Sequence, residues 1–559
     1  MSDIRRSILW VIFGFSLVLL WDQWQIHNGR EATFFPTKPP AAVQAAAQNA
    51  ASAGVPAASA VSASAVPGAG AASNTPRQQH VVSTDVLKLT FDSEGGSLIG
   101  ADILQHRAVT GKPSQTQPLT LLAQTPTHTY VAQTGLVGGT LPTHKTPMKL
   151  VAGGQSLADG QNEIRLRFES EPVNGVVLAK TYTAQRGSYR LSVQHEVINR
   201  GAAAVTPQLY LQLVRDGSKA DSETPFYSTF TGPAVYSDAA KYEKVEFDAI
   251  DKQKAEFQKN ANDGYVAMVQ HYFATAWWLD GGAARENFVR KLDQNLYSAG
   301  LLTTLPSVAP GQSHTSTAHL FVGPQAEKVL EQLTPGLELV KDYGWVTILA
   351  KPLYWLLEKI HGVVQNWGWS IVLLVVLLKA AFYWLNASAY RSMAKMKAVN
   401  PRIMELRERM KDKPQQMQLE MMKIYREEKV NPVGGCLPIM LQIPVFIALY
   451  WVLLSSVEMR NAPWAGWITD LSTPDPYFIL PLVMTLTTVV QTALNPLPPD
   501  PMQAKMMWIM PLVFSVMFFF FPAGLVLYWI TNNVLTIAQQ AHINHRMGVP
   551  LKINLPKFK

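Results

Sequence analysis

The feature that most constrains this chain is a set of long uncharged stretches in its C-terminal part. Cys436–Val457, Tyr477–Leu494 and Met506–Ala541 contain no Asp, Glu, Lys or Arg, and Trp369–Asn386 contains only Lys379. A helix of about 20 apolar residues is long enough to cross a hydrocarbon core of about 30 Å. Because only 16% of the residues are charged, composition also favours a membrane protein.

The last of these stretches is too long for one membrane span. As a single helix its 36 residues would measure roughly 54 Å at about 1.5 Å per residue. Pro522-Ala523-Gly524 near its middle is a helix breaker. We therefore expect two spans here, and the spans of the C-terminal core (residues 368–546) are predicted at 368–388, 436–457, 477–494, 506–521 and 523–541.

A sixth span is predicted at residues 1–24, where Arg5 and Arg6 precede an apolar run. A cleaved signal peptide is the alternative. An uncleaved anchor is favoured because Trp21 and Trp24 suit a membrane interface and no small-x-small cleavage site follows directly. Residues 25–80 are rich in Ala, Pro and Ser, which predicts a flexible linker.

Residues 81–340 have a different pattern, in which apolar and polar residues alternate over short segments separated by turn residues. Examples are Ile164–Phe168, Tyr189–Gln194, Leu209–Leu213 and Thr315–Val322. This period of two predicts a large all-β sandwich with one wet face on each sheet. Since the single cysteine of the chain, Cys436, lies elsewhere, this domain must be held by its own core.

A helical period returns at residues 341–367. One face would carry Trp345, Leu349, Pro352, Leu356, Ile360, Val363 and Trp367. The pattern predicts an amphipathic helix lying in the membrane surface. A helix packed on the sandwich would bury the same stripe and remains the alternative.

The basic residues predict the topology through the positive-inside rule. Arg391–Lys429 contains eleven Lys and Arg against six acidic residues, the tail 547–559 is basic, and the loop after Val457 contains only Arg460. We therefore expect a multi-pass protein of the inner membrane with both termini in the cytoplasm and the β domain in the periplasm. The net charge of +8 fits anionic lipid headgroups, and DNA is not expected as a partner.

The segment 389–431 is predicted to be a cytoplasmic helical hairpin. Its candidate contact residues are Arg391, Lys395, Arg402 and Arg407, which would meet lipid headgroups or ribosomal RNA, so the ribosome is a candidate partner of the hairpin and tail. The hairpin also contains seven methionines. They would adapt to varied apolar clients, although packing of the two helices explains the same spacing.

Lys379 is the most informative residue of the chain. A cation near the middle of a span costs at least about 2.5 kcal/mol and usually faces a protein interior or a wet cavity. None of the five spans predicted in the C-terminal core contains an Asp or Glu. Polar side chains of other spans would line a water-filled groove around it: Gln442, Thr485, Gln491, Asn532 and Asn533, with Thr487, Thr488, Thr531 and Thr536 also available.

For the Thr and Asn residues, hydrogen bonds between helices are an equally good explanation. A positively charged groove would attract the polar part of an incoming chain and relieve part of its desolvation cost. Its apolar part would leave sideways into lipid. This mechanism needs no covalent step, so we expect no catalytic residue, metal or cofactor.

Six motifs of the chain resemble the YidC/Oxa1/Alb3 family of membrane protein insertases, in its Gram-negative form. They are Tyr390–Met396, Glu428–Pro438, Gln442–Phe446, Asp475–Tyr477, Asp500–Gln503 and Phe521–Tyr528. The resemblance implies insertion and folding of nascent inner-membrane proteins, alone or with the Sec translocon, in a groove open to cytoplasm and lipid. It also implies an outer domain similar to sugar-binding β-sandwiches.

The resemblance assigns Lys379, Gln442 and Asn533 to the groove, and Tyr528 and Trp529 to the surface where clients slide. The family usually has an arginine at the position of Lys379. Lysine keeps the charge but lacks the planar guanidinium that binds a carboxylate through two hydrogen bonds.

Two other functions fit parts of the chain. A solute transporter would show an internal repeat between the halves of its membrane region and a paired acidic residue for ion coupling, and we find neither in this sequence. An anchored carbohydrate-active enzyme would draw a carboxylate pair from residues such as Glu163, Glu169, Asp216 and Asp280. Such an enzyme needs one span, which leaves five without a purpose.

Overall fold

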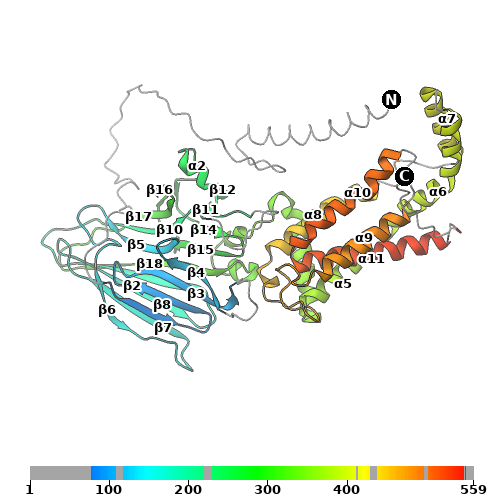
Figure 1. Cartoon of the computed structure of the whole chain (residues 1–559). Helices are drawn as coiled ribbons and strands as arrows, with labels where there is room; N and C mark the ends of the chain where they lie inside the picture. Colours follow the sequence, from blue (N-terminus) through cyan, green and yellow to red (C-terminus); the bar gives the residue numbers. More distant parts are fainter. Residues whose placement is uncertain are drawn as a thin grey trace, which may run out of the picture. The chain divides into compact units, whose positions relative to one another are not determined.

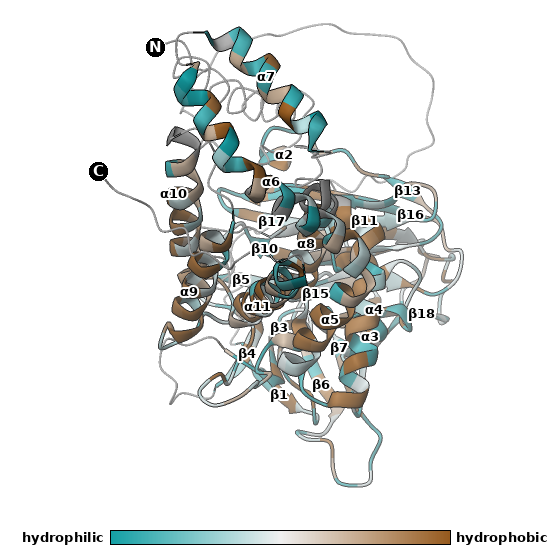
Figure 2. Ribbon diagram, turned by 90° about the vertical axis from the view of Figure 1, so that its right-hand side faces the viewer, coloured by the Kyte–Doolittle hydropathy of each residue, from teal (hydrophilic) through white to brown (hydrophobic). Residues whose placement is uncertain are grey.

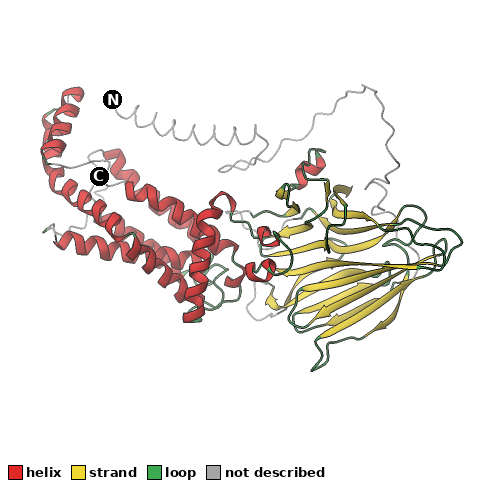
Figure 3. Ribbon diagram, turned by 180° about the vertical axis from the view of Figure 1, so that it is seen from behind, coloured by secondary structure: helices red, strands yellow, loops and turns green. Residues whose placement is uncertain are grey.

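The computed structural model describes residues 77–108, 117–218, 229–410, 413–428, 437–495 and 501–546, together with Gly548. The predicted anchor at 1–24, the predicted linker as far as residue 76 and the basic tail apart from Gly548 lie outside the described residues. Figure 3 distinguishes the strand-rich N-terminal part of the described chain from its helical C-terminal part.

The strand-rich part is a β domain of two nine-stranded sheets (Figure 1). Pairings along both sheets are antiparallel. One sheet has the order β1-β2-β3-β4-β5-β10-β17-β16-β13 and the other the order β12-β11-β14-β15-β18-β9-β8-β7-β6. The predicted all-β sandwich is confirmed. Its strands are β1 Gln79–Ser83, β2 Leu87–Asp92, β3 Ser97–Arg107, β4 Pro118–Gln124, β5 Thr129–Val137, β6 Met148–Gly153, β7 Glu163–Ser170, β8 Val176–Gln185, β9 Arg190–Asn199, β10 Gln208–Asp216, β11 Gly232–Ser237, β12 Lys241–Lys244, β13 Asn260–Ala261, β14 Tyr265–Gln270, β15 Phe273–Leu279, β16 Arg285–Asp293, β17 Leu296–Thr304 and β18 Ser313–Pro324.

The alternating pattern predicts burial well for β7, near the edge of its sheet, and poorly for β10, near the centre of the other sheet. In β7, Ile164, Leu166 and Phe168 are buried while Glu163 and Arg165 are exposed. In β10, every residue from Leu209 to Asp216 is buried. The expectation of one wet face is therefore wrong for this strand.

The reason lies in the position of β10 between β5 and β17. One side of the strand contributes Leu209, Leu211 and Leu213 to the main core of the sandwich. On its other side, Tyr210 packs with Val137, Phe288 and Leu302, and Val214 packs with Ile99 and Val131. A central strand thus buries both faces because its neighbours supply large apolar side chains on each.

One lysine is fully buried in this sandwich. Lys180 of β8 donates from Nζ to the carbonyl oxygens of Gly95, at 2.6 Å, and Thr134, at 2.7 Å. A neutral amine has two N–H donors, and these two carbonyls satisfy both. Burial lowers the pKa of Lys180 from its usual value of 10.5 to about 7.

This shift predicts the pH dependence of the β domain. Between about pH 7 and 10.5 the unfolded chain keeps the proton on this amine and the folded domain releases it. The free energy of unfolding should therefore rise from pH 7 to 9, by up to about 1.4 kcal/mol per pH unit, and fall as the pH returns toward 7. Lys180→Met should remove this slope, and the exposed Lys149→Met should keep it. Hydrogen exchange of β8 and β9 in the solubilised full chain measures both, and equal slopes in wild type and Lys180→Met would refute the assignment.

The described helices comprise short elements, some of them within the β domain, and longer helices that make up the helical part. The short ones are α2 Phe247–Asp251, α3 Glu327–Glu331, η2 Leu337–Val340, η3 Gly344–Val346, η4 Val457–Met459 and η5 Phe518–Phe520. The longer ones are α4 Thr347–Val364, α5 Trp367–Ala381, α6 Tyr383–Arg409, α7 Pro414–Glu427, α8 Leu437–Ser455, α9 Ile479–Leu494, α10 Pro501–Met517 and α11 Ala523–Arg546. Figure 2 shows mostly apolar residues along α9 and largely hydrophilic residues on α7.

In the part of the chain that the structure describes, no single helix is both long and apolar enough to cross a bilayer. Trp367–Ala381 and Tyr383–Ser392 meet that requirement together, with a bend of 63° between them. The bend divides the span predicted at 368–388 at Phe382, where one helix ends and the next begins. Six spans therefore remain a prediction.

Helix α4 packs against other helices, and its placement in the membrane surface remains a prediction. Leu349 and Val363 of the predicted face are 41% and 85% exposed. The buried residues are Ala350, Tyr354 and Leu357, which join a core cluster with residues of α5, α8 and α11. The alternative, packing on the sandwich, differs from this arrangement, because the partners of these three residues are mainly helices.

Candidate functional site

A partly open cavity of about 210 Å³ lies among α5, α8 and α11. Its volume would hold several water molecules at about 30 Å³ each. Within the described chain its lining residues are Val375, Leu378, Lys379, Phe382, Gln442, Ile443, Val445, Phe446, Tyr528, Trp529 and Asn532. Lys379 is the charged residue of this lining, and Gln442 and Asn532 are the residues of the lining that carry side-chain amides.

Lys379 reaches the cavity from the last turn of α5 and is half-buried. Its Nζ donates to Oγ1 of Thr536 on α11 at 2.8 Å. An ammonium group has three N–H donors, and this hydroxyl accepts from one of them. The cavity lining contains no Asp or Glu. The geometry thus combines a cation with neutral polar groups and apolar walls.

The other polar residues predicted for the groove divide into two groups. Gln442 and Asn532 line the cavity with Lys379, and Gln442 donates from Nε2 to Oδ1 of Asn386 at 3.1 Å. Asn533 is 3% exposed and donates from Nδ2 to the hydroxyls of Thr487 and Thr488, at 3.2 and 3.0 Å. Asn533 therefore makes hydrogen bonds between helices, which was the alternative to lining the groove.

Thr485 and Gln491 also lie outside the cavity lining. The Thr485 hydroxyl donates to the carbonyl oxygen of Pro481 one turn earlier in α9. Asn386 was not predicted from the sequence, although it is the polar residue that ends the apolar stretch after Lys379. It orients Gln442 at the cavity.

The aromatic wall of the cavity joins two helices. Phe446 of α8 stacks on Tyr528 of α11 with ring centroids 5.9 Å apart, and meets the Trp529 ring edge-on at 4.7 Å. Trp529 also contacts Phe518 at 5.0 Å. Tyr528 and Trp529, predicted to contact clients, therefore lie beside the lysine in one cavity.

The hairpin of α6 and α7 has its own small core. Val399, Ile403 and Ile424 are buried there, with Met396 and Met421 packed against them. Met396 and Met421 therefore help to pack the two helices together. Met404 and Met422, in contrast, are 47% and 48% exposed.

The four predicted contact residues of the hairpin differ in exposure and pairing. Arg391 and Lys395 are exposed, and Arg407 is half-buried. Arg402 pairs with Glu428 at 3.0 Å. The surface left for headgroups or RNA therefore includes Arg391 and Lys395.

The carboxylates considered for carbohydrate chemistry each pair with a different basic residue. Glu163 pairs with Arg165, Glu169 with Arg167, Asp216 with His128 and Asp280 with His319. These contacts give no support for a catalytic carboxylate pair. Among the described residues no group of three His, Cys, Asp or Glu side chains is arranged to hold a metal ion.

Comparison with known proteins gives matches along nearly the whole chain. The family model for the YidC periplasmic domain matches residues 79–356, and the model for the 60Kd inner membrane protein matches residues 359–549. The membrane protein insertase YidC of Ralstonia nicotianae is 53% identical over 98% of this chain and 99% of its own length. The corresponding protein of Cupriavidus taiwanensis is 54% identical, over 98% of each chain. A crystal structure of an active YidC insertase with its first transmembrane domain resolved aligns with a TM-score of 0.37 and 19% identity, over 82% of this chain and 91% of that one.

Proposed function

Since this chain belongs to the YidC family of membrane protein insertases, we propose that it inserts and folds integral membrane proteins in the bacterial inner membrane. Its relatives are named as insertases, and an insertase is not an enzyme. The observation that carries the proposal is the half-buried Lys379 in a cavity whose other lining residues are neutral.

The proposed mechanism uses charge and hydration. Thr536 accepts one hydrogen bond from the Lys379 ammonium, so water or a polar client group would accept the others. An acidic or polar client segment would be attracted to this cation. The free-energy cost of moving that segment out of bulk water would therefore be smaller. The client would thus have a polar binding site partway across the membrane.

The aromatic residues supply the apolar half of the mechanism. Phe446, Tyr528 and Trp529 form a wall whose rings present large apolar area at a small loss of conformational entropy. A client's apolar segment would slide along this wall toward lipid while its polar segment stays near Lys379. Exposed apolar residues of α9, such as Leu482 and Leu486, suit contact with lipid.

In this proposal the chain crosses the membrane six times, with both termini in the cytoplasm and the β domain in the periplasm. Nascent membrane proteins are its clients, and the Sec translocon, the ribosome and membrane lipids are its further partners. Arg391 and Lys395 of α6 would meet lipid headgroups or ribosomal RNA because both side chains are exposed.

Depletion in the native cell tests the function. Newly made small membrane proteins should then lose their protease-protected fragments, because their polar segments no longer cross. Expression of the wild-type chain from a plasmid should restore protection. Normal protection of these clients after full depletion would contradict the proposed function.

A further inference from the structure

The segment that joins the β domain to α4 contains a buried lysine that contacts two partly buried carboxylates. Domains joined by a short linker are expected to move relative to one another unless their interface is extensive. Here Lys341, Tyr343 and Val346 of the joining segment are at most 3% exposed. A lysine is almost never fully buried unless it is paired, so the Lys341 ammonium needs a specific partner.

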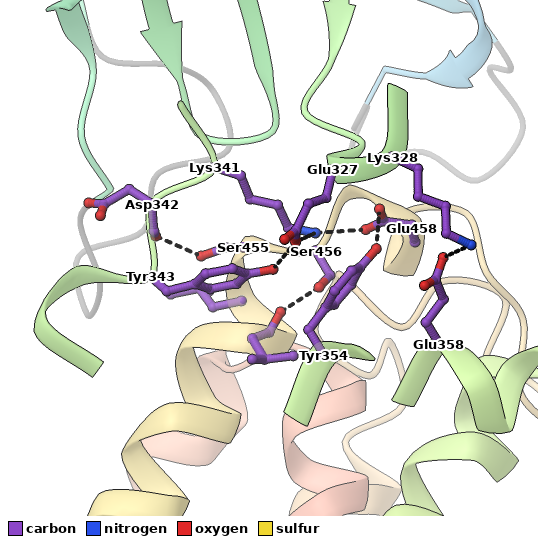
Figure 4. Close-up of polar contacts among 12 residues, drawn as sticks. Glu327, Lys328, Lys341, Asp342, Tyr343, Tyr354, Glu358, Ser455, Ser456 and Glu458 are labelled. Atoms are coloured by element: carbon purple, nitrogen blue, oxygen red, sulfur yellow. Dashed lines mark hydrogen bonds and ion pairs between the residues drawn. The ribbon is translucent and has the colours of Figure 1, made fainter. Parts of the chain in front are cut away.

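Two carboxylates from distant parts of the chain supply that partner. Lys341 Nζ lies 3.5 Å from Oε2 of Glu458 in η4, and 4.0 Å from Oε2 of Glu327 in α3. It also lies 3.7 Å from the ring centroid of Tyr354, within range of a cation–π contact. We call Glu327, Lys341 and Glu458 the junction cluster; Figure 4 shows the three side chains converging.

Two tyrosines complete the hydrogen bonding of the carboxylates. The Tyr343 hydroxyl donates to Oε2 of Glu327 at 3.0 Å, and the Tyr354 hydroxyl donates to Oε1 of Glu458 at 2.7 Å (Figure 4). Burial and the neighbouring carboxylates raise the pKa of both tyrosines well above the usual value, so these hydroxyls keep their protons. The cluster therefore links α3, the joining segment, α4 and the end of α8.

Further contacts tie the same end of α8 to the β domain. His271, after β14, contacts the carbonyl oxygen of Leu454 through Nε2 at 3.0 Å. Arg460 donates to the carbonyl oxygen of Arg107 at 2.7 Å. Lys328 of α3 pairs with Glu358 of α4 at 2.6 Å (Figure 4). The helix held here, α8, also carries Gln442 and Phe446 of the cavity.

We propose that the junction cluster holds the β domain, α4 and the C-terminal end of α8 together as one rigid body. The β domain would thereby fix the position of α8, a helix that lines the cavity. Removing Lys341 leaves two carboxylates facing each other without their cation. Losing one member of a buried charge cluster is costly, whereas replacing all members together is often neutral. A rigid junction of this kind does not depend on the proposed function.

Hydrogen exchange of the purified full chain in detergent tests the rigid junction. Lys341→Met and, separately, Glu458→Gln should each raise the exchange rate at 340–346 and 456–461 by at least tenfold. The triple variant Lys341→Met/Glu327→Gln/Glu458→Gln should return both segments to within about threefold of wild type, because glutamine still accepts from the tyrosines. Lys359→Met, at an exposed lysine of α4, should change neither segment.

Glu458→Gln keeps the test informative if Lys341→Met fails to fold, because it retains the Lys341–Glu327 pair. Wild-type exchange in Glu458→Gln would overturn the rigid junction. A triple variant that exchanges as fast as the single variants would overturn it as well, since charge removal alone would then not explain the loosening.

Discussion

Replacing Lys379 with leucine should lower the insertion of clients that have acidic translocated segments by at least about tenfold, which corresponds to about 1.4 kcal/mol. A charge pair at about 4 Å contributes roughly 4 kcal/mol at an effective dielectric constant near 20, so the loss exceeds this threshold with room for screening by water. Lys379→Arg should insert the same clients at near wild-type levels because it keeps the charge. Protease protection of newly made clients in depleted cells carrying each variant measures the difference.

The matched control for this experiment is Lys359→Leu, which makes the same substitution at an exposed position of α4. Immunoblots should show equal amounts of each variant in the membrane fraction. If Lys379→Leu inserts a broad set of acidic clients normally, a required positive charge is rejected.

Deleting residues 342–367 should abolish insertion, whereas replacing residues 79–324 with a short Gly/Ser linker should leave a measurable fraction of it. The first deletion removes α4, whose Ala350, Tyr354 and Leu357 belong to the core of the helical part. Burial of each large apolar side chain contributes about 1.5–3 kcal/mol, a large share of a net stability of about 5–15 kcal/mol. The second deletion removes strands that have their own core and keeps Glu327, Lys341 and Glu458.

Membrane-fraction levels and client protection, measured together, separate misfolding from loss of function. The reverse ranking, with the β-domain deletion inactive and the α4 deletion active, would contradict this division between the two parts. A Gly/Ser linker of a different length controls for the altered spacing between residue 78 and α3.

The sequence predicted those parts of the fold in which one local pattern determines burial. Ile164, Leu166 and Phe168 alternate with polar residues and are buried as expected. The pattern failed for β10, because burial of Tyr210 and Val214 depends on neighbouring strands supplied by distant segments. In α4, apolar residues occur on more than one face, so the pattern did not identify Ala350, Tyr354 and Leu357 as the residues that pack in the core of the helical part.

The site was predictable to the extent that single residues stood out. A lysine within an apolar stretch marked the cavity, and Gln442, Asn532, Tyr528 and Trp529 lie there with it. Asn533 could not be assigned, since a buried amide serves a cavity and a helix contact equally well, and it bonds to Thr487 and Thr488. The contact of Lys341 with Glu458 joins residues 117 positions apart, and no local pattern predicts such a pair.

The central claim is that client chains occupy the cavity beside Lys379 during insertion. Photo-crosslinking of ribosome-bound, arrested clients tests it directly, with a photoreactive residue placed at Ile443 or Trp529 in the cavity lining, or at Val534, which is 48% exposed on α11 and outside that lining. The account predicts client adducts from Ile443 and Trp529, few from Val534, and fewer from all three positions in the Lys379→Leu background. Adducts from Val534 with none from either cavity position would contradict it.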